Sequence, residues 1–377
     1  MLILEAPLGS RTQRMRVLVV STPIGVLGSG AGGGVEHTGT MIVAGLLACG
    51  HAVTVLAGEG SVLPPSCADA TLWQEAGVDQ TSWQHRPHDT PATIPADALL
   101  SRFWQRALEH QESFDRILNL GYDHLPFWLT RFVATPLCHL VSMGSVALVM
   151  DEVIEAVAAW GPDRLAFHTA AQAADFRLAA PPVLVGNGFD LSLYHPPAAE
   201  QVESALAWAG RISPEKGLED AARVAARLGL PLRVWGLRQD EAYAAAVERS
   251  VPPGTIEWRG FQPTDRLQAD LGRCRVFLNT PRWNEAFGNV VVEAMACGVP
   301  VAAYARGGPG ELVQEGINGA LATPDDLDSL EAAVRRAAEL DRAGCRAWAE
   351  RHHSPEAFSA RMEAWLQAAR PHPRSPS

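Results

Sequence analysis

Long apolar runs are absent from the sequence. No stretch reaches about 18 consecutive apolar residues, the length that a membrane-spanning helix needs, so we predict no membrane span. The opening MLILEAPLGSRTQRM lacks the apolar core of a signal peptide, and we expect residues 1–15 to form an N-terminal extension before the first strand. The sequence also contains no basic amphipathic helix of the kind that binds a membrane surface. These absences favour a cytoplasmic protein.

Excess positive charge and paired cysteines are absent as well. The formal net charge is −11, whereas a nucleic-acid-binding protein would present a basic face. The six cysteines are scattered, and no two have the CxxC spacing of a zinc or redox site. We therefore expect reduced, buried thiols, no disulfide framework and no nucleic-acid partner. The sequence contains no indication of an oligomeric state.

What the sequence does contain is a repeated alternation of strand and helix patterns. At about 150 residues per domain, a chain of 377 residues suggests two domains. Helical patterns separate most of the buried-strand patterns, and two more helical patterns cover 325–341 and 355–369. This alternation predicts an α/β protein with two Rossmann-like, doubly wound parallel-sheet domains and an interdomain cleft. The strand patterns lie at 15–22, 51–58, 114–120, 136–143, 163–169, 181–187, 204–210, 230–236, 254–260, 274–280 and 300–305.

The boundary between the two halves is marked by the proline-rich stretch YHPPAAEQVE at 194–203. We place the first domain at 16–197 and the second at 198–354. Residues 355–377 are expected to form a C-terminal helix that packs back on the first domain and then ends in a disordered tail.

The segment GSGAGGGVEH at 28–37 contains Gly28-x-Gly30-x-x-Gly33, the spacing of a dinucleotide-binding loop. In such a fold the first glycine ends the strand directly, whereas here a longer loop intervenes. Three interpretations stay open: an oxidoreductase site, a flexible loop, or a loop whose backbone closely approaches a phosphate-bearing ligand. The third fits Gly33 and Gly34 ahead of a helix that we expect to begin near Glu36.

Two cations follow the first strand pattern of the second half. In WAGRISPEKG, Arg211 lies just after a strand and Lys216 just before a helix, and such strand ends face the ligand crevice of an open α/β sheet. Arg211 offers a planar pair of donors and Lys216 a point charge, a combination that suits a diphosphate. The plainer interpretation is two solvated charges in a loop.

The segment NEAFGNVVVEAMACG at 284–298 places one glutamate before a predicted helix and one inside it. Phe287, Gly288 and Asn289 open this helix, where unpaired N–H groups attract phosphate. Glu293 stands in an apolar run, and a buried carboxylate needs hydrogen-bond donors. Ligand hydroxyls are the obvious donors, a ribose diol for Glu293 and sugar hydroxyls for Glu285. An exposed helical glutamate is the structural alternative.

Together these elements resemble a known family. Arg211-x4-Lys216, Glu285-x7-Glu293, ARGGPGELV (305–313) and EGINGAL (315–321) resemble the family-4 retaining glycosyltransferases of GT-B fold. The resemblance runs from residue 16 to about 368, with the paired-glutamate segment as its most specific part. Within the family, STPIGVLGSGAGGGVE together with LVSMGS is similar to the cyanobacterial UDP-glucose:tetrahydrobiopterin glucosyltransferases.

The resemblance implies a role for each matching residue. Arg211 and Lys216 would hold the donor diphosphate and stabilise the leaving nucleotide. Glu293 would bind the ribose, and Glu285 would bind the transferred sugar and act in catalysis with the two cations. The implied donor site comprises Gly33, Gly34, Arg211, Lys216, Glu285, Phe287, Gly288, Asn289 and Glu293.

On the acceptor side the chain departs from the family pattern. Many members place a histidine after a mid-domain strand, whereas CHLVSMGS has His139 within the strand and Ser142 at its end. We expect the His139 ring to be satisfied inside the strand layer. Another strand end, NLGYDHLPFW at 119–128, adds further candidates, with helix capping by Asp123 and packing as the alternative. The acceptor-side candidates are Glu36, Tyr122, Asp123, His124 and Ser142.

The resulting hypothesis is a retaining hexosyltransferase that moves glucose from UDP-glucose to a hydroxyl of a small molecule, such as the pterin tetrahydrobiopterin. No two carboxylates are arranged as a glycosidase nucleophile and acid, so we expect front-face attack without a covalent intermediate. No DxD-type motif occurs at the diphosphate position, so we expect no metal and no cofactor. The alternatives are a GT-B sugar-nucleotide epimerase or hydrolase, a non-catalytic sugar-nucleotide-binding protein, and a nicotinamide-dependent dehydrogenase.

Overall fold

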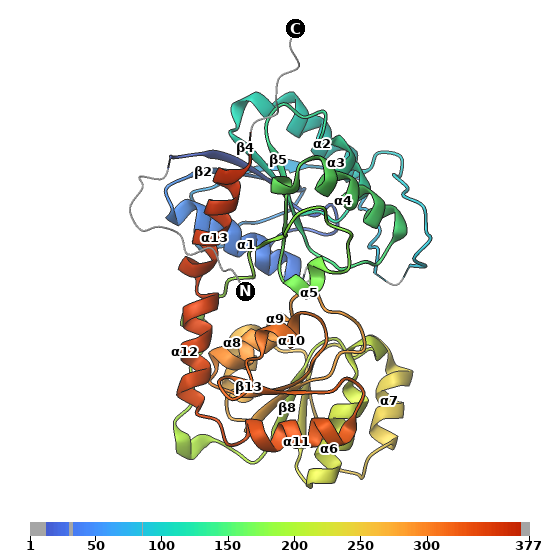
Figure 1. Ribbon diagram of the computed structural model, residues 1–377, viewed down its shortest axis with the longest axis vertical. Coiled ribbons are helices and arrows are strands. Elements are labelled where there is room, and N and C mark those ends of the chain that lie inside the picture. Colours follow the sequence, from blue (N-terminus) through green and yellow to red (C-terminus); the bar gives the residue numbers. More distant parts are fainter. Residues whose placement is uncertain (1–12, 30–32, 85, 371–377) are drawn as a thin grey trace. The chain divides into compact units, whose positions relative to one another are not determined.

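A computed structural model describes residues 13–29, 33–84 and 86–370 (Figure 1). Contacts divide the chain into two compact units. The first unit takes the chain up to Gly188 and again from Pro355 onward, and the second unit is Phe189–Ser354. Each unit has its own parallel sheet and its own hydrophobic core.

The described part of the first unit contains a seven-stranded sheet in the order β3-β2-β1-β4-β5-β6-β7, and all neighbouring strands run parallel. The order reverses direction between β1 and β4, which makes their carboxyl ends the switch point of this sheet. The strands are β1 (Arg16–Val20), β2 (Ala52–Gly58), β3 (Thr71–Glu75), β4 (Arg116–Asn119), β5 (Leu137–Val141), β6 (Leu165–Phe167) and β7 (Val183–Leu184).

Helices cover both faces of this sheet (Figure 1). Along β1, Val17 and Val19 join one apolar cluster while Leu18 and Val20 join another, because successive strand residues point to opposite faces. A continuous apolar run is therefore buried on both sides, as a doubly wound sheet requires. The helices are α1 (Gly33–Ala48), α2 (Leu99–Glu109), α3 (His124–Leu129), α4 (Leu148–Trp160), α5 (Ala170–Ala173) and α13 (Pro355–Ala368).

The last helix, α13, packs against α1 in the first unit (Figure 1). Its Phe358 and Trp365 are buried in the same cluster as Ile42 of α1. The contact is close, because a Cβ atom at Gly45 would overlap the hydroxyl of Ser359. A segment from the end of the described chain thus completes the core of the first unit.

The described part of the second unit repeats the design with a six-stranded parallel sheet in the order β10-β9-β8-β11-β12-β13. Here the switch point lies between β8 and β11. The strands are β8 (Leu206–Ala209), β9 (Leu232–Trp235), β10 (Ile256–Gly260), β11 (Val276–Asn279), β12 (Val301–Tyr304) and β13 (Gly319–Ala322). The helices are α6 (Leu218–Leu228), α7 (Glu241–Arg249), α8 (Thr264–Leu271), α9 (Asn289–Ala296), α10 (Gly307–Leu312), α11 (Leu327–Ala337) and α12 (Arg342–His353). The predicted pair of doubly wound parallel sheets is confirmed.

The sequence patterns miss two strands and two helices. Strand β3 lies at the sheet edge with a half-exposed, mixed pattern, and β13 is built from small residues. Helix α10 contains glycine and proline, which are poor helix formers, and α12 is strongly polar. Helix α1 also begins at Gly33, ahead of the expected start near Glu36. Neighbouring elements stabilise these segments, so tertiary contacts override weak local patterns.

Candidate functional site

The donor-side candidates of the second unit gather at the switch point of its sheet. Arg211 follows β8, and Lys216 ends the short 3-10 helix η6 (Pro214–Lys216) that leads into α6. Glu285 lies in the loop that follows β11, the strand beside β8. Because the carboxyl ends of parallel strands meet at one edge of a sheet, these loops are neighbours although they are far apart in sequence.

Lys216 and Glu285 form an ion pair at this edge. Both side chains are largely buried, with relative exposures of 21% and 7%. Trp283 reinforces the pair, since its Nε1 donates to Glu285 Oε1 at 3.3 Å and the Lys216 ammonium lies 5.2 Å from its ring centroid. The cation assigned to a diphosphate and the carboxylate assigned to a sugar therefore touch each other. Trp283 was not predicted, although it stands two residues before Glu285.

The loop that carries Lys216 is fixed by its next residue. Gly217 has a φ of 65° in the left-handed region, and a Cβ atom there would overlap the carbonyl oxygen of Thr280. The Thr280 hydroxyl in turn donates to the Gly217 carbonyl at 2.7 Å. Glycine is thus required for the loop after β8 to lie against the end of β11.

Arg211 is more exposed than Lys216, with 34% of its side chain accessible. Its guanidinium lies 3.5 Å from Glu215 Oε1 and donates to Gln239 Oε1 at 3.1 Å. The Ser213 hydroxyl also donates to Glu215 at 2.7 Å. Glu215 therefore orients the Arg211 guanidinium.

Helix α9 begins as expected, with Gly288 as the residue before its first turn and Asn289 as its first residue. Gly288 has a φ of 99°, so its backbone conformation requires glycine whether or not a ligand approaches. Phe287 is buried in the apolar cluster of the second unit.

Glu293 finds a donor within the protein. Its half-buried carboxylate accepts a hydrogen bond from the Tyr194 hydroxyl at 3.4 Å. Burial raises the pKa of Glu293 to about 7, and the bond from Tyr194 lowers it only in part. The expectation that ligand hydroxyls are the obvious donors is therefore incomplete, because Tyr194, a residue the sequence did not single out, already donates to this carboxylate.

In the first unit, the loop before α1 is only partly described. Gly30 and Gly32 of the glycine run lie outside the described residues, while Gly33 is the first residue of α1 and Gly34 accepts a hydrogen bond from Thr38. Glu36 accepts from the backbone N–H of Gly28 at 2.5 Å and lines a cavity of about 160 Å³ at the end of β1. Glu36 therefore also fixes the loop that precedes its own helix.

His139 has both ring nitrogens engaged, as predicted. Its Nδ1 lies 3.1 Å from the Asn119 amide and its Nε2 lies 2.7 Å from the Thr130 hydroxyl. The ring stacks on Phe127 at 4.2 Å, and full burial lowers the pKa of His139 to about 3. His139 is a neutral core residue of the first unit.

The remaining acceptor-side candidates have different surroundings. Tyr122 is buried, and its hydroxyl donates to the Gly144 carbonyl at 3.0 Å, so it serves packing within the unit. Ser142 lies half-buried just after β5. Asp123 precedes α3, but its carboxylate caps no N–H of the helix and instead accepts from Trp83 Nε1 at 3.4 Å. The alternative interpretation, in which the Asp123 side chain caps the helix, is therefore wrong.

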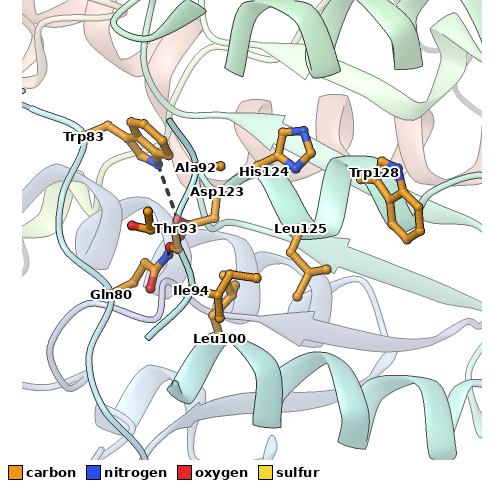
Figure 2. A pocket seen from close by; sticks show the side chains of 10 residues that line it. All are labelled: Gln80, Trp83, Ala92, Thr93, Ile94, Leu100, Asp123, His124, Leu125 and Trp128. Atoms are coloured by element: carbon orange, nitrogen blue, oxygen red, sulfur yellow. Dashed lines mark hydrogen bonds between the residues drawn. The ribbon is translucent and has the colours of Figure 1, made fainter. Parts of the chain in front are cut away.

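Asp123 and His124 line a pocket of about 290 Å³ (Figure 2). Burial raises the pKa of Asp123 to about 7 and lowers that of the half-buried His124. Trp83 and Trp128 belong to the same lining, as does Gln80, which carried no recognisable signal in the sequence. The pocket has the lining Gln80, Trp83, Ala92, Thr93, Ile94, Leu100, Asp123, His124, Leu125 and Trp128.

Within 13–29, 33–84 and 86–370, no group of three or more His, Cys, Asp or Glu side chains could hold a metal ion. Over the same stretches, no helix is both long and apolar enough to cross a membrane.

Part of the second unit matches a known family model. Residues 200–354 match the family model "Glycosyl transferases group 1", and the donor-side candidates of the second unit lie within this matched stretch. The chain is 32% identical over 169 residues to a D-inositol 3-phosphate glycosyltransferase of Mycobacterium marinum, covering 40% of this chain and 36% of the relative. It is also 32% identical over 117 residues to the O-antigen chain mannosyltransferase B of Escherichia coli, covering 30% of each. The matched region thus spans about a third of these curated relatives.

Solved structures resemble the chain over a greater length. Anabaena Alr3699/HepE in complex with UDP has a TM-score of 0.71 at 18% identity, covering 94% of this chain and 100% of that one. AviGT4, a glycosyltransferase involved in avilamycin A biosynthesis, has a TM-score of 0.67 at 21% identity, covering 94% and 98%. At these identities the likeness establishes the fold, which is GT-B with two parallel-sheet α/β domains.

Proposed function

We propose that this protein is a retaining glycosyltransferase that transfers glucose from UDP-glucose to a hydroxyl of a small molecule, with a pterin such as tetrahydrobiopterin as acceptor. The observation that carries the proposal is the contact of Lys216 with Glu285 inside the stretch that matches the group 1 model. A sugar nucleotide has its pyrophosphate directly beside its hexose. A cation that binds the pyrophosphate and a carboxylate that binds the hexose must therefore be neighbours.

The nature of the donor is supported by a structural neighbour. Anabaena Alr3699/HepE has been solved with UDP and with UDP-glucose, and it shares the fold of this chain at TM-scores of 0.71 and 0.68. In our proposal the uridine diphosphate lies at the carboxyl ends of β8 and β11, and its ribose diol donates to Glu293. The half-buried carboxylate of Glu293 then gains donors in addition to the Tyr194 hydroxyl.

When the donor binds, Lys216 and Glu285 exchange their contact with each other for contacts with the donor. The diphosphate attracts the Lys216 ammonium, and Arg211 adds a second cation from the same loop. Glu285 can then accept hydrogen bonds from hydroxyls of the glucose, while Trp283 still donates to it. The ion pair keeps the buried carboxylate neutralised before the donor arrives.

The reaction follows from this placement. As the bond between the anomeric carbon and the β-phosphate oxygen breaks, negative charge builds on UDP, where Lys216 and Arg211 stabilise it more than in the ground state. The acceptor hydroxyl attacks the anomeric carbon from the face that UDP leaves, and its proton passes to the departing phosphate oxygen. The products are the glucoside with retained anomeric configuration and UDP.

The decisive experiment is a mass-spectrometric acceptor screen with UDP-glucose that includes reduced and oxidised pterins. We expect a product heavier than its acceptor by one hexose, an α-anomeric signal in its proton NMR spectrum, and full activity in EDTA. A β-linked product would refute retention. Rapid consumption of UDP-glucose without acceptor would favour an epimerase or hydrolase, and donor binding without transfer to any acceptor would favour a non-catalytic binding protein.

A further inference from the structure

The pocket around Asp123 lies at the switch point of the first sheet, where β4 ends and α3 begins (Figure 2). One wall comes from the start of α3 and the other from the long segment between β3 and α2. Ligands of open α/β sheets bind at such switch points. Its volume of about 290 Å³ stands at the lower end of small-molecule sites and suits one small ring system.

Two buried oxygen atoms in this lining lack a hydrogen-bond partner among the described residues. Asp123 is 1% exposed, its Oδ1 accepts from Trp83 Nε1 at 3.4 Å, and its Oδ2 has no partner within hydrogen-bonding distance, although the nearby Gln80 side chain helps to stabilise the ionised carboxylate. Gln80 is 7% exposed, and its amide nitrogen donates to the Thr93 carbonyl at 2.8 Å while Oε1 has no partner. In Figure 2, Gln80 and Asp123 lie at the same end of the pocket. A buried acceptor without a partner costs free energy, so we expect a ligand with hydrogen-bond donors to bind at this end of the pocket.

The rest of the lining defines the body of the ligand. Trp83, Ile94, Leu100, Leu125 and Trp128 provide aromatic and aliphatic walls, and Trp128 is 53% exposed. Flat rings are the ligands that such walls bind best, because they bury apolar faces and stack on indoles. A carbohydrate would leave most of its hydroxyls unpaired against these walls.

The charged groups around the pocket restrict the range of ligands further. The lining in the described chain includes neither Lys nor Arg, and burial lowers the pKa of His124, so this histidine is neutral at pH 7. Burial favours the protonated form of Asp123, whereas the side chains of Trp83 and Gln80 and the charge of Arg86, which lies over the Trp83 ring, favour the ionised form. An ionised Asp123 repels phosphate and carboxylate groups, whereas donors stabilise its charge. With Asp123 ionised, the pocket therefore favours donor groups over anionic groups.

From these observations we propose that the pocket is the recognition site for the acceptor's ring. The ligand is a flat, uncharged heteroaromatic ring that presents two adjacent N–H donors, as the amino group and ring N–H of a 2-amino-4-oxopyrimidine unit do. Asp123 accepts both donors with its two oxygens, and Gln80 Oε1 accepts the second hydrogen of the amino group. This inference rests on the proposed function and narrows its acceptor to rings with a donor–donor edge.

The test uses equilibrium binding without any sugar nucleotide, so it does not depend on catalysis. The probes are 2-amino-4-hydroxypteridine and 2,4-dihydroxypteridine, which differ only in the replacement of the amino donor by an oxygen. Calorimetry with the full-length protein should show at least tenfold tighter binding of the amino ring. Asp123→Asn should abolish this preference, and Gln80→Leu should weaken binding of the amino ring several-fold. Asp69→Asn, at an exposed site outside the pocket, is the matched control.

Each outcome decides between the two proposals. Equal binding of both rings, no binding of either, or an unchanged preference in a folded Asp123→Asn variant would overturn the inference. If the amino ring binds as expected but receives no glucose, the pocket assignment stands and the glycosyltransferase proposal fails. If glucose is transferred to a small molecule and Asp123→Asn leaves the KM for that acceptor unchanged, the transferase stands and the pocket assignment fails.

Discussion

Lys216 and Glu285 lie 69 positions apart in the chain, and their charges meet in one ion pair at the end of the second unit's central strands. In our proposal, a sugar nucleotide binds at this pair. Its members should therefore respond to the donor in ways that a merely structural ion pair would not.

The first prediction concerns loss of the cation. Lys216→Ala should weaken UDP binding about 100-fold, since a charge-assisted contact is lost and Glu285 is left buried without its cation. Lys216→Arg should retain most of the affinity. Titration calorimetry with UDP measures both, and a thermal melt checks that each variant is folded. Undiminished UDP affinity of the alanine variant would argue strongly against a donor site here.

The second prediction uses the fact that Lys216 is the only lysine in the sequence. An amine-acylating reagent can modify only this side chain and the chain's N-terminal amine. Saturating UDP should slow acylation of Lys216 at least tenfold, because a diphosphate contacting the ammonium shields it. The N-terminal amine serves as the control within the same sample. Peptide mass spectrometry reads both sites, and equal rates with and without UDP would count against the assignment.

The third prediction concerns the pH dependence of donor binding. Burial raises the pKa of Glu293 to about 7, so the carboxylate is largely protonated at pH 6 and largely ionised at pH 8. A ribose diol binds the ionised form as a donor, and UDP affinity should therefore rise about tenfold over this range. Tyr194 and Cys297 are the other titratable groups beside Glu293, and neither ionises below pH 8, because burial raises the pKa of both.

Glu293→Gln supplies the control for the pH dependence of UDP affinity. The variant removes the titration of the Glu293 carboxyl, whereas the UDP phosphates still titrate. The variant should bind UDP more weakly at pH 8 and with little dependence on pH. A wild-type profile that coincides with the variant's would show that Glu293 does not meet the ribose.

The fourth prediction concerns stability. The pKa of Asp123 is about 7 in the folded protein, because the carboxyl is buried, and returns to the ordinary aspartate value of 3.8 when the chain is unfolded. A raised pKa means that this group stabilises the fold fully below about pH 4 and that its contribution is lost as the pH rises through 7. The free energy of unfolding of Asp123→Asn, measured relative to that of the wild type, should therefore increase by about 1–3 kcal/mol from pH 5 to pH 8. Denaturant unfolding at both values tests this, and a constant difference would contradict it.

The fifth prediction separates His139 from the site. His139→Ala should cost about 2–4 kcal/mol in unfolding free energy, because it leaves a cavity beside Phe127 and removes one hydrogen-bond partner each from Asn119 and Thr130. UDP affinity of the folded variant should stay unchanged. An imidazole NMR titration of the wild type should show no protonation of this ring above pH 5.

The alternation of strands and helices was predictable because its signal is local. Continuous apolar runs such as LAWA in β8 and VFLN in β11 are buried on both faces, and helical patterns between them imply parallel strands. Edge strand β3 and the glycine-rich α10 escaped prediction, because neighbouring elements rather than their own residues stabilise them.

For the site, the sequence by itself determined which residue types stand at the strand ends: Arg211 and Lys216 after one strand, Glu285 and Glu293 around one helix. Tertiary structure alone decided their partners. It paired Lys216 with Glu285, brought the Tyr194 hydroxyl to Glu293, and placed Gln80 in the pocket of Asp123. The physical reason is that strand order in a doubly wound sheet joins loops from distant parts of the chain, and no local pattern records which loops will meet.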